Sequence, residues 1–323
     1  MFSLVRSGRT PIGAVALLLA LLLALAAACG GDGDDGTTAG TSTPAATTAA
    51  SQYPLTLTDG KSRSVTLEAA PQRIASLSPA ATETLFAIGA GDQVAAVDKY
   101  STYPAEAASR QQLDAFEPSV EAIVGAQPDL VFLVYDPGNL VDGLTNAGLT
   151  VFFLETPTSV EGVLDQIGML GQATGHTQEA EELVTTMEQR INDIEVKVAD
   201  VQQGPRFFHE VDNQLYTVAP ASFVGNLYTI LKARNIAAGT DQAFPQLSQE
   251  AIIDADPEVI ILGDAAGGES AETVKARPGW GNISAVKSGR VYVIDPDIVS
   301  RPGPRLVDAL QTLAQMLYPE RFE

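Results

Sequence analysis

Short apolar runs alternate along the chain with segments whose apolar residues recur at helical spacing. The first pattern predicts strands and the second predicts helices. Strands are predicted at residues 55–58, 64–68, 73–77, 94–97, 130–135, 151–154, 206–211, 215–218, 259–262 and 291–294. Helices are predicted at residues 80–88, 119–126, 140–147, 160–174, 223–233, 249–255 and 306–317. Because strands that alternate with helices favour parallel pairing, we expect an α/β protein whose mainly parallel sheets are covered on both faces.

The middle of the chain contains a long segment without Gly or Pro. Residues 176–203 keep apolar residues at helical spacing, and Gly204-Pro205 follows them. This segment predicts one helix that would span roughly 40 Å at about 1.5 Å per residue.

The two halves of the chain share a repeated unit. SVEAIVGAQPDLVFL at residues 119–133 and SQEAIIDADPEVIIL at residues 248–262 are identical at seven of fifteen positions, without a gap. A helix–proline–strand unit on each side of a long helix indicates two similar lobes joined by a rod. We therefore predict two Rossmann-like αβ lobes, at residues 53–175 and 204–323, joined by one long interdomain helix at 176–203.

The first residues have the features of a targeting segment. Arg6 and Arg9 precede an apolar run that ends in three alanines before Cys29, the single cysteine of the chain. This pattern predicts a signal peptide at residues 1–28 and lipidation of Cys29, with an ordinary secretory signal or a retained helix as alternatives. With one cysteine, no intrachain disulfide can form.

Residues 29–52 consist mainly of Gly, Asp, Thr, Ala and Ser. Such a segment cannot bury enough apolar surface to offset its ordering entropy, so we predict a flexible linker behind the lipid. The expected location is extracytoplasmic, with the protein anchored to the membrane through Cys29. Either a periplasm or the outer face of the cytoplasmic membrane fits the sequence.

Composition and motifs exclude several classes of function. Asp and Glu outnumber Lys and Arg by 40 to 19, for a net charge of −21, which disfavours nucleic acid as a partner. Two histidines are too few for a bare transition-metal receptor, so no metal site and no cofactor are predicted. The sequence has no GxSxG, Walker or HExxH motif, and we predict a monomeric protein without enzymatic activity.

Several runs resemble a known family. RIASLSPAATETLFAIGAGDQVAAVDKYSTYP at residues 73–104, FPQLSQEAI and PGWGNISAVKSGRVYVID are similar to periplasmic binding proteins for cobalamin and iron siderophores. The resemblance covers residues 71–317. It implies an ABC importer's substrate-binding lipoprotein that carries cobalamin or a related corrinoid to a permease dimer with its ATPase. Alternatives are a ferric-siderophore or haem carrier and, more remotely, a chemosensory receptor or an enzyme.

The resemblance also implies which residues bind the ligand. A cleft between the lobes, at the carboxyl ends of the strands, is expected to hold it. The residues implied are Tyr100, Phe116, Tyr135, Tyr216, Phe244, Asp297 and Arg301. Flat aromatic faces suit a corrin, porphyrin or catecholate. Each aromatic residue is equally compatible with a place in the core, and Arg301 can pair with a ligand carboxylate or with Asp297.

The repeated unit places Glu121 and Glu250 in the first turn of two equivalent predicted helices. Glutamate there also offsets the helix dipole, which contributes roughly 0.3–1 kcal/mol. In the family that the chain resembles, matching glutamates dock to arginines of the two permease subunits. We therefore expect Glu121 and Glu250 to dock the protein to its importer.

Overall fold

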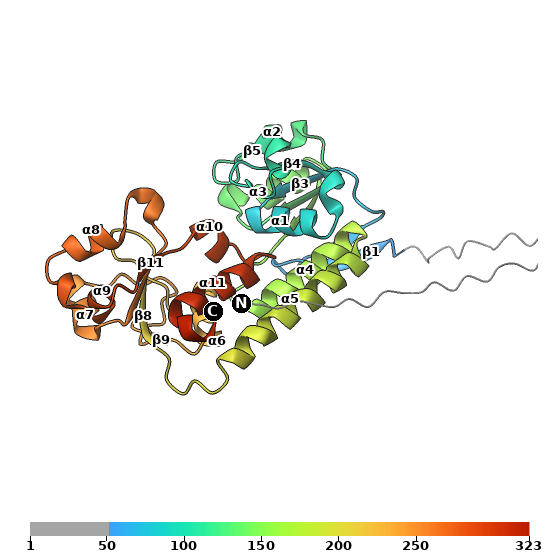
Figure 1. Cartoon of the computed structure of the whole chain (residues 1–323). Coiled ribbons are helices and arrows are strands. Elements are labelled where there is room, and N and C mark those ends of the chain that lie inside the picture. Colours follow the sequence, from blue (N-terminus) through green and yellow to red (C-terminus); the bar gives the residue numbers. More distant parts are fainter. Residues whose placement is uncertain (1–51, 323) are drawn as a thin grey trace, which may run out of the picture. The chain divides into compact units, whose positions relative to one another are not determined.

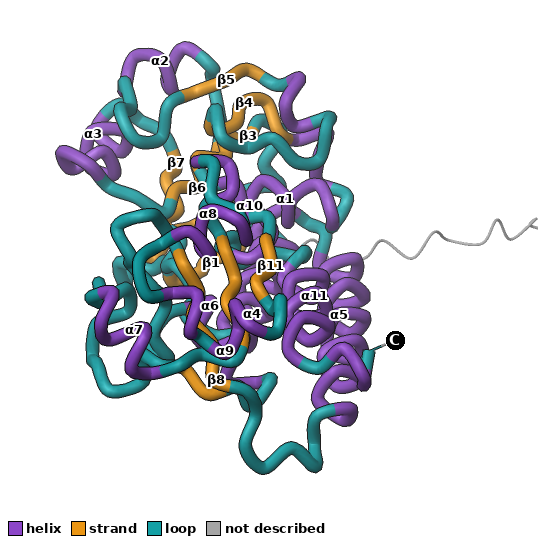
Figure 2. Tube along the Cα trace, turned by 60° about the vertical axis from the view of Figure 1, so that its left-hand side comes forward, coloured by secondary structure: helices purple, strands orange, loops and turns teal. Residues whose placement is uncertain are grey.

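The computed structural model describes residues 52–322, so the predicted signal peptide, Cys29 and all of the predicted linker except Gln52 lie outside the described residues. Two separate parallel sheets confirm the predicted fold class (Figures 1 and 2). The N-terminal sheet has the order β5 (Gln111–Leu113), β4 (Val94–Asp98), β3 (Ile74–Leu77), β6 (Leu130–Leu133), β7 (Thr150–Phe153). The C-terminal sheet has the order β11 (Val291–Val293), β10 (Val259–Leu262), β8 (Arg206–Glu210), β9 (Arg234–Asn235).

Helices flank both sheets, and a small antiparallel pair precedes them. The pair is β1 (Leu55–Thr58) with β2 (Ser64–Leu67). The N-terminal lobe contains α1 (Pro79–Ala87), α2 (Val120–Gly125) and α3 (Leu140–Asn146). The C-terminal lobe contains α6 (Phe223–Ile230), α7 (Gln249–Ala255), α8 (Ala271–Ala276), α9 (Ser284–Lys287) and α10 (Pro296–Val299). Helices α4 (Val160–Thr174), α5 (Thr177–Lys197) and α11 (Leu306–Leu317) lie where the lobes join. Among residues 52–322 no helix has the length and apolar character of a membrane span.

The sequence repeat is also a repeat in structure. Helix α2 leads into β6, and α7 leads into β10. Strand β6 pairs with β3 and β10 pairs with β8, and β3 and β8 are the strands that come first along the chain in their sheets. The Arg73 guanidinium donates to carbonyl oxygens just past α2, and Asp129 accepts from the Arg73 amide at 3.0 Å. Arg206 likewise donates to carbonyl oxygens at the end of α7, and Glu258 accepts from the Arg206 amide at 2.9 Å. The two lobes therefore use the same contacts to close the same helix–strand unit.

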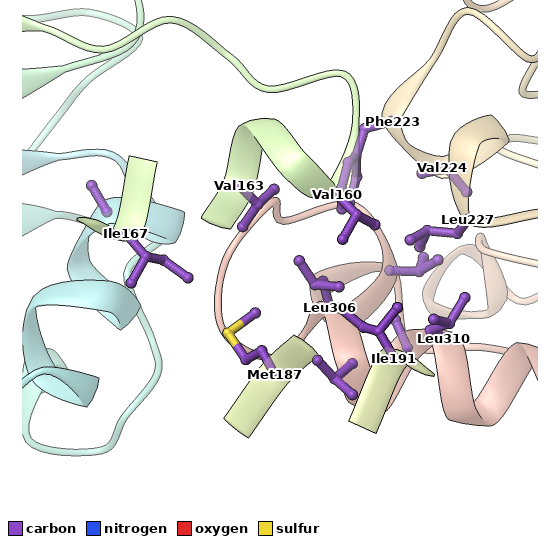
Figure 3. Packing of buried hydrophobic residues seen from close by; sticks show 14 of the residues in the cluster. Val160, Val163, Ile167, Met187, Ile191, Phe223, Val224, Leu227, Leu306 and Leu310 are labelled. Carbon is purple, nitrogen blue, oxygen red and sulfur yellow. The ribbon is translucent and has the colours of Figure 1, made fainter. Parts of the chain in front are cut away.

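One continuous hydrophobic cluster joins the lobes. Helix α4 contacts α1 of the N-terminal lobe and α6 of the C-terminal lobe, while α5 packs along both α4 and α11. The residues labelled in Figure 3 are Val160, Val163 and Ile167 of α4, Met187 and Ile191 of α5, Phe223, Val224 and Leu227 of α6, and Leu306 and Leu310 of α11. Because close-packed cores resist shear, this joint favours small movements of one lobe against the other.

Helix α5 is shorter than predicted, since it ends at Lys197 and not at residue 203. Its 21 residues span about 30 Å at ~1.5 Å per residue. Arg321 donates to the carbonyl oxygen of Lys197 at 2.9 Å and to the carboxylate of Asp200 at 2.6 Å. This tertiary contact satisfies a terminal carbonyl and takes the place of another helical turn.

The strand predicted at residues 215–218 is wrong. Leu215 has a φ of 66°, which lies in the left-handed region and not in the extended one. Tyr216 and Thr217 form isolated bridges, to Gln246 and Glu210 respectively. The sequence patterns also missed β5, β9, α8, α9 and α10, because elements of two to six residues are too short to show a periodicity.

Candidate functional site

A cleft lies at the carboxyl ends of the N-terminal strands and reaches residues of the C-terminal lobe. We name it the main cleft; its volume is about 540 Å³. It is lined by Leu77, Pro79, Asp98, Tyr100, Ala115, Phe116, Val134, Tyr135, Thr156, Asp297 and Arg301. Five of the seven predicted ligand residues therefore meet at one place in the structure.

Three of these residues form an exposed aromatic wall, which consists of Tyr100, Phe116 and Tyr135. They follow β4, β5 and β6, of which β5 and β4 are neighbours in the sheet and β6 lies on the other side of β3. The rings of Tyr100 and Phe116 lie edge to face with centroids 5.5 Å apart, and those of Phe116 and Tyr135 lie 6.3 Å apart. Their exposed fractions are 48%, 65% and 56%. Clustered aromatic side chains this exposed are typical of a binding surface.

Two aspartates hold the loops that carry the wall. The buried carboxylate of Asp98 accepts from the amides of Tyr100 and Ala115, at 3.0 and 3.2 Å, and so links the loops after β4 and β5. Burial raises the pKa of Asp98. Asp114 accepts from the amide of Phe116 at 3.0 Å. These hydrogen bonds hold the backbone that carries Tyr100 and Phe116.

The opposite side of the main cleft is polar. Arg301 binds Asp297 at 2.7 Å, which is one of the two pairings that its sequence position allowed. Its guanidinium also donates to the Tyr100 carbonyl oxygen at 3.1 Å and to Glu83 at 3.3 Å. Arg301 therefore connects the C-terminal lobe to the aromatic wall as well as facing the cleft.

Glu83 supports the site from behind the main cleft, and the sequence analysis missed it. It lies on α1 with 3% of its surface exposed, and it binds Arg301 and also Arg305, whose Nε donates to its carboxylate at 2.8 Å. The Arg305 guanidinium also stacks 4.1 Å from the ring centre of Tyr103. A glutamate within the otherwise apolar and small residues of α1 was the signal available in the sequence.

A second, smaller cavity adjoins the main cleft, because Thr156 lines both. We name it the side recess; its volume is about 230 Å³ and Phe244 is at its wall. His209, at the end of β8, also lines it. Tyr216, the remaining predicted ligand residue, is 37% exposed and lines neither cavity.

His209 is neutral in the folded protein. It is 3% exposed, and its Nδ1 lies 2.8 Å from the hydroxyl oxygen of Tyr228. Burial lowers the pKa of His209 to about 4. The structure places it at the wall of the side recess.

Stability should reflect this depressed pKa. Between pH 6.5 and about 4 the unfolded chain binds a proton at residue 209 while the folded protein does not. The contribution of His209 to the free energy of unfolding is therefore full above pH 6.5 and decreases as the pH falls toward 4. At ~1.4 kcal/mol per pKa unit, the decrease is about 3 kcal/mol. The measurement is urea unfolding of wild type and His209→Gln at pH 7 and pH 4. Wild type should lose about 3 kcal/mol more than the variant, and an equal loss in both proteins would contradict the assignment.

Glu121 and Glu250 occupy equivalent exposed positions on α2 and α7, one in each lobe. The two helices begin alike, with Ser119 and Ser248 as N-caps. Hydrogen bonds from its own amide and from the Ser119 hydroxyl lower the pKa of Glu121, which keeps the carboxylate ionised. Within residues 52–322 no three His, Cys, Asp or Glu side chains converge as a metal site would require.

Comparisons with known proteins agree on one family. A family model described as periplasmic binding protein matches residues 74–298. An uncharacterized ABC transporter substrate-binding lipoprotein of Bacillus subtilis is 33% identical, over 84% of this chain and 88% of its own length. A cobalamin-binding protein of Halobacterium salinarum is 30% identical, over 83% and 75%. The crystal structure of a possible iron-binding, periplasmic solute-binding protein from Staphylococcus epidermidis has a TM-score of 0.69 and 28% identity, covering 77% of this chain and 99% of that one.

Proposed function

Since the chain belongs to the periplasmic binding protein family, we propose that it is the extracytoplasmic substrate-binding component of an ABC importer and that its ligand is cobalamin or a related corrinoid. The aromatic wall of the main cleft carries this proposal. Three exposed rings beside a polar edge match a ligand that has a wide apolar face and a polar rim. No bond-making step is part of this function.

The charge of the main cleft favours a corrinoid over an anionic chelate. Its charged lining residues are Asp98, Asp297 and Arg301, two carboxyl groups and one cation. Arg301 is already engaged by Asp297 and Glu83, so a carboxylate on the ligand would find no free cation in the lining. Burying such a carboxylate without a partner is costly. The amides at the rim of a corrin are neutral, so their burial does not carry the cost of burying an unpaired charge.

An iron chelate is the second candidate. The possible iron-binding protein of Staphylococcus epidermidis has the same fold, and the aromatic wall would stack equally well on a porphyrin or a catecholate. For such a ligand Arg301 would have to exchange Asp297 for a ligand carboxylate. Haemin and a ferric siderophore therefore belong in any binding measurement beside cyanocobalamin.

Delivery to the importer would use the two lobes together. Glu121 and Glu250 give each lobe one exposed carboxylate in an equivalent helix, which suits a permease dimer with two similar subunits. The packed joint between the lobes would let docking spread them by a small amount. A lipid on Cys29 would keep the protein close to that permease.

Truncation of the aromatic wall should weaken ligand binding. In Phe116→Ala the stacked ring is lost, and the dissociation constant for cyanocobalamin is expected to rise about thirtyfold, or about 2 kcal/mol, as for a buried aromatic anchor. The measurement is isothermal titration calorimetry of the full chain. Val196→Ala, at an exposed apolar position on α5 outside both cavities, is the matched control. Equal affinity in wild type and Phe116→Ala would remove the wall from the site.

A further inference from the structure

The side recess differs from the main cleft in having no charged lining residue. Its walls are mainly valine, phenylalanine, proline and alanine, with Ser222, Ser300 and two threonines at the edges. The hydroxyl of Ser222 is already used, since it donates to Ala219 and accepts from Gly225. Among the buried residues that line the recess, His209 is the polar side chain that is still available to hydrogen-bond to a bound group.

The proton on His209 is fixed by its neighbour. Tyr228 is 1% exposed, and its hydroxyl has Nδ1 of His209 as its hydrogen-bond partner within residues 52–322. A buried hydroxyl is satisfied best when it donates, so the Tyr228 O–H donates to Nδ1. Neutral imidazole then carries its proton on Nε2. Nε2 is therefore a hydrogen-bond donor and not a metal ligand, and it has no partner within the described residues.

Gly263 keeps the space beside Nε2 open. This residue follows β10 and lines the recess. A Cβ at position 263 would lie 3.2 Å from Nε2 of His209 and 3.2 Å from the carbonyl oxygen of Glu210. Its φ is not in the left-handed region, so the backbone does not require glycine here. The close approach to His209 is what a side chain would disturb.

We infer that the side recess binds a slim, uncharged arm of the ligand, whose oxygen accepts a hydrogen bond from Nε2 of His209. The inference rests on the proposed function, and it extends the site beyond the main cleft. The recess, at about 230 Å³, is too small for a macrocycle but has room for a side-chain amide. A carboxylate would be desolvated there without a cation. The recess thus selects the amide arms of a corrinoid over the carboxylate arms of a haem.

The first test uses paired variants of the full chain with cyanocobalamin in calorimetry. Gly263→Ala crowds Nε2, and His209→Phe removes the donor. Each is expected to weaken binding about three- to tenfold, the effect of one lost neutral hydrogen bond. Gly239→Ala, in open surroundings, and His176→Phe, outside both cavities, are the controls and should bind as wild type does.

The second test identifies the chemistry of the arm. In derivatives of cyanocobalamin one side-chain amide at a time is replaced by a carboxylic acid. One derivative should bind wild type at least tenfold more weakly than cyanocobalamin, because its carboxylate would be desolvated in the recess without a cation. Nitrogen-15 spectra of the two histidines, assigned with His176→Phe, should show the proton of His209 on Nε2.

The outcomes separate the inference from the proposed function. If cyanocobalamin binds wild type, Gly263→Ala and His209→Phe with equal affinity, the recess is not part of the site and the inference is wrong, while the proposed function stands. A proton found on Nδ1 of His209 would also overturn it. If neither cyanocobalamin, haemin nor a ferric siderophore binds wild type, the proposed function falls and the inference falls with it.

Discussion

Replacing Glu121 and Glu250 together by lysine is expected to abolish stimulation of the importer's ATPase, while the affinity for cyanocobalamin stays at the wild-type value. Both carboxylates are exposed and lie outside the main cleft and the side recess. If they pair with permease arginines, the reversal places like charges opposite one another, which costs several kcal/mol at an interface. Each single reversal should leave partial activity, because the other lobe still docks. The measurement is ATP hydrolysis by the cognate permease–ATPase complex in proteoliposomes.

A matched control separates docking from helix stability. Glu161 and Glu272 are also exposed glutamates in the first turn of a helix, on α4 and α8. Their reversal to lysine removes the same favourable interaction with a helix dipole. This second double variant should stimulate the ATPase as wild type does. Full stimulation by the Glu121→Lys, Glu250→Lys protein would show that docking uses other residues.

Removing the carboxylate of Glu83 should produce the largest loss of stability. In Glu83→Ala the guanidinium groups of Arg301 and Arg305 keep their partly buried positions without this carboxylate. Arg301 keeps its pair with Asp297, whereas Arg305 loses the carboxylate that it binds, and leaving a buried charge unpaired costs about 3–5 kcal/mol. Because Glu83 joins α1 to the segment before α11, ligand affinity should fall as well. Urea unfolding monitored by circular dichroism measures the first effect and calorimetry the second.

Two further variants test whether the loss of stability comes from the carboxylate of Glu83. Glu83→Gln keeps the shape and part of the hydrogen bonding, and it should lose less stability than Glu83→Ala. Glu195→Ala, an exposed position on α5, should change stability by about 0.5 kcal/mol or less. An unfolding midpoint for Glu83→Ala equal to that of wild type would mean that the ion cluster contributes no net stability.

The fold was predictable because its signals are local. Strand and helix patterns depend on nearby residues, and the repeat at residues 119–133 and 248–262 gave the two lobes directly. The residues of the aromatic wall, Tyr100, Phe116 and Tyr135, were implied by the family resemblance and not by a local pattern, and the structure places them at the carboxyl ends of parallel strands. The family resemblance added Asp297 and Arg301 on the opposite side.

The features that were missed depend on residues far apart in the sequence. Glu83 and Arg305 are separated by 222 positions, and no local pattern connects them. The end of α5 is set by Arg321, more than a hundred residues later. Contacts of this kind become visible only once both lobes are in place.

The central claim is that the main cleft binds a corrinoid, and calorimetric titration of the full chain with cyanocobalamin, haemin and a ferric siderophore tests it most directly. The account predicts saturable one-to-one binding of cyanocobalamin, with haemin and the siderophore weaker because the cleft offers no free cation. Tight binding of haemin or the siderophore with no response to cyanocobalamin would contradict the ligand assignment, and no binding of any of the three would contradict the claim as a whole.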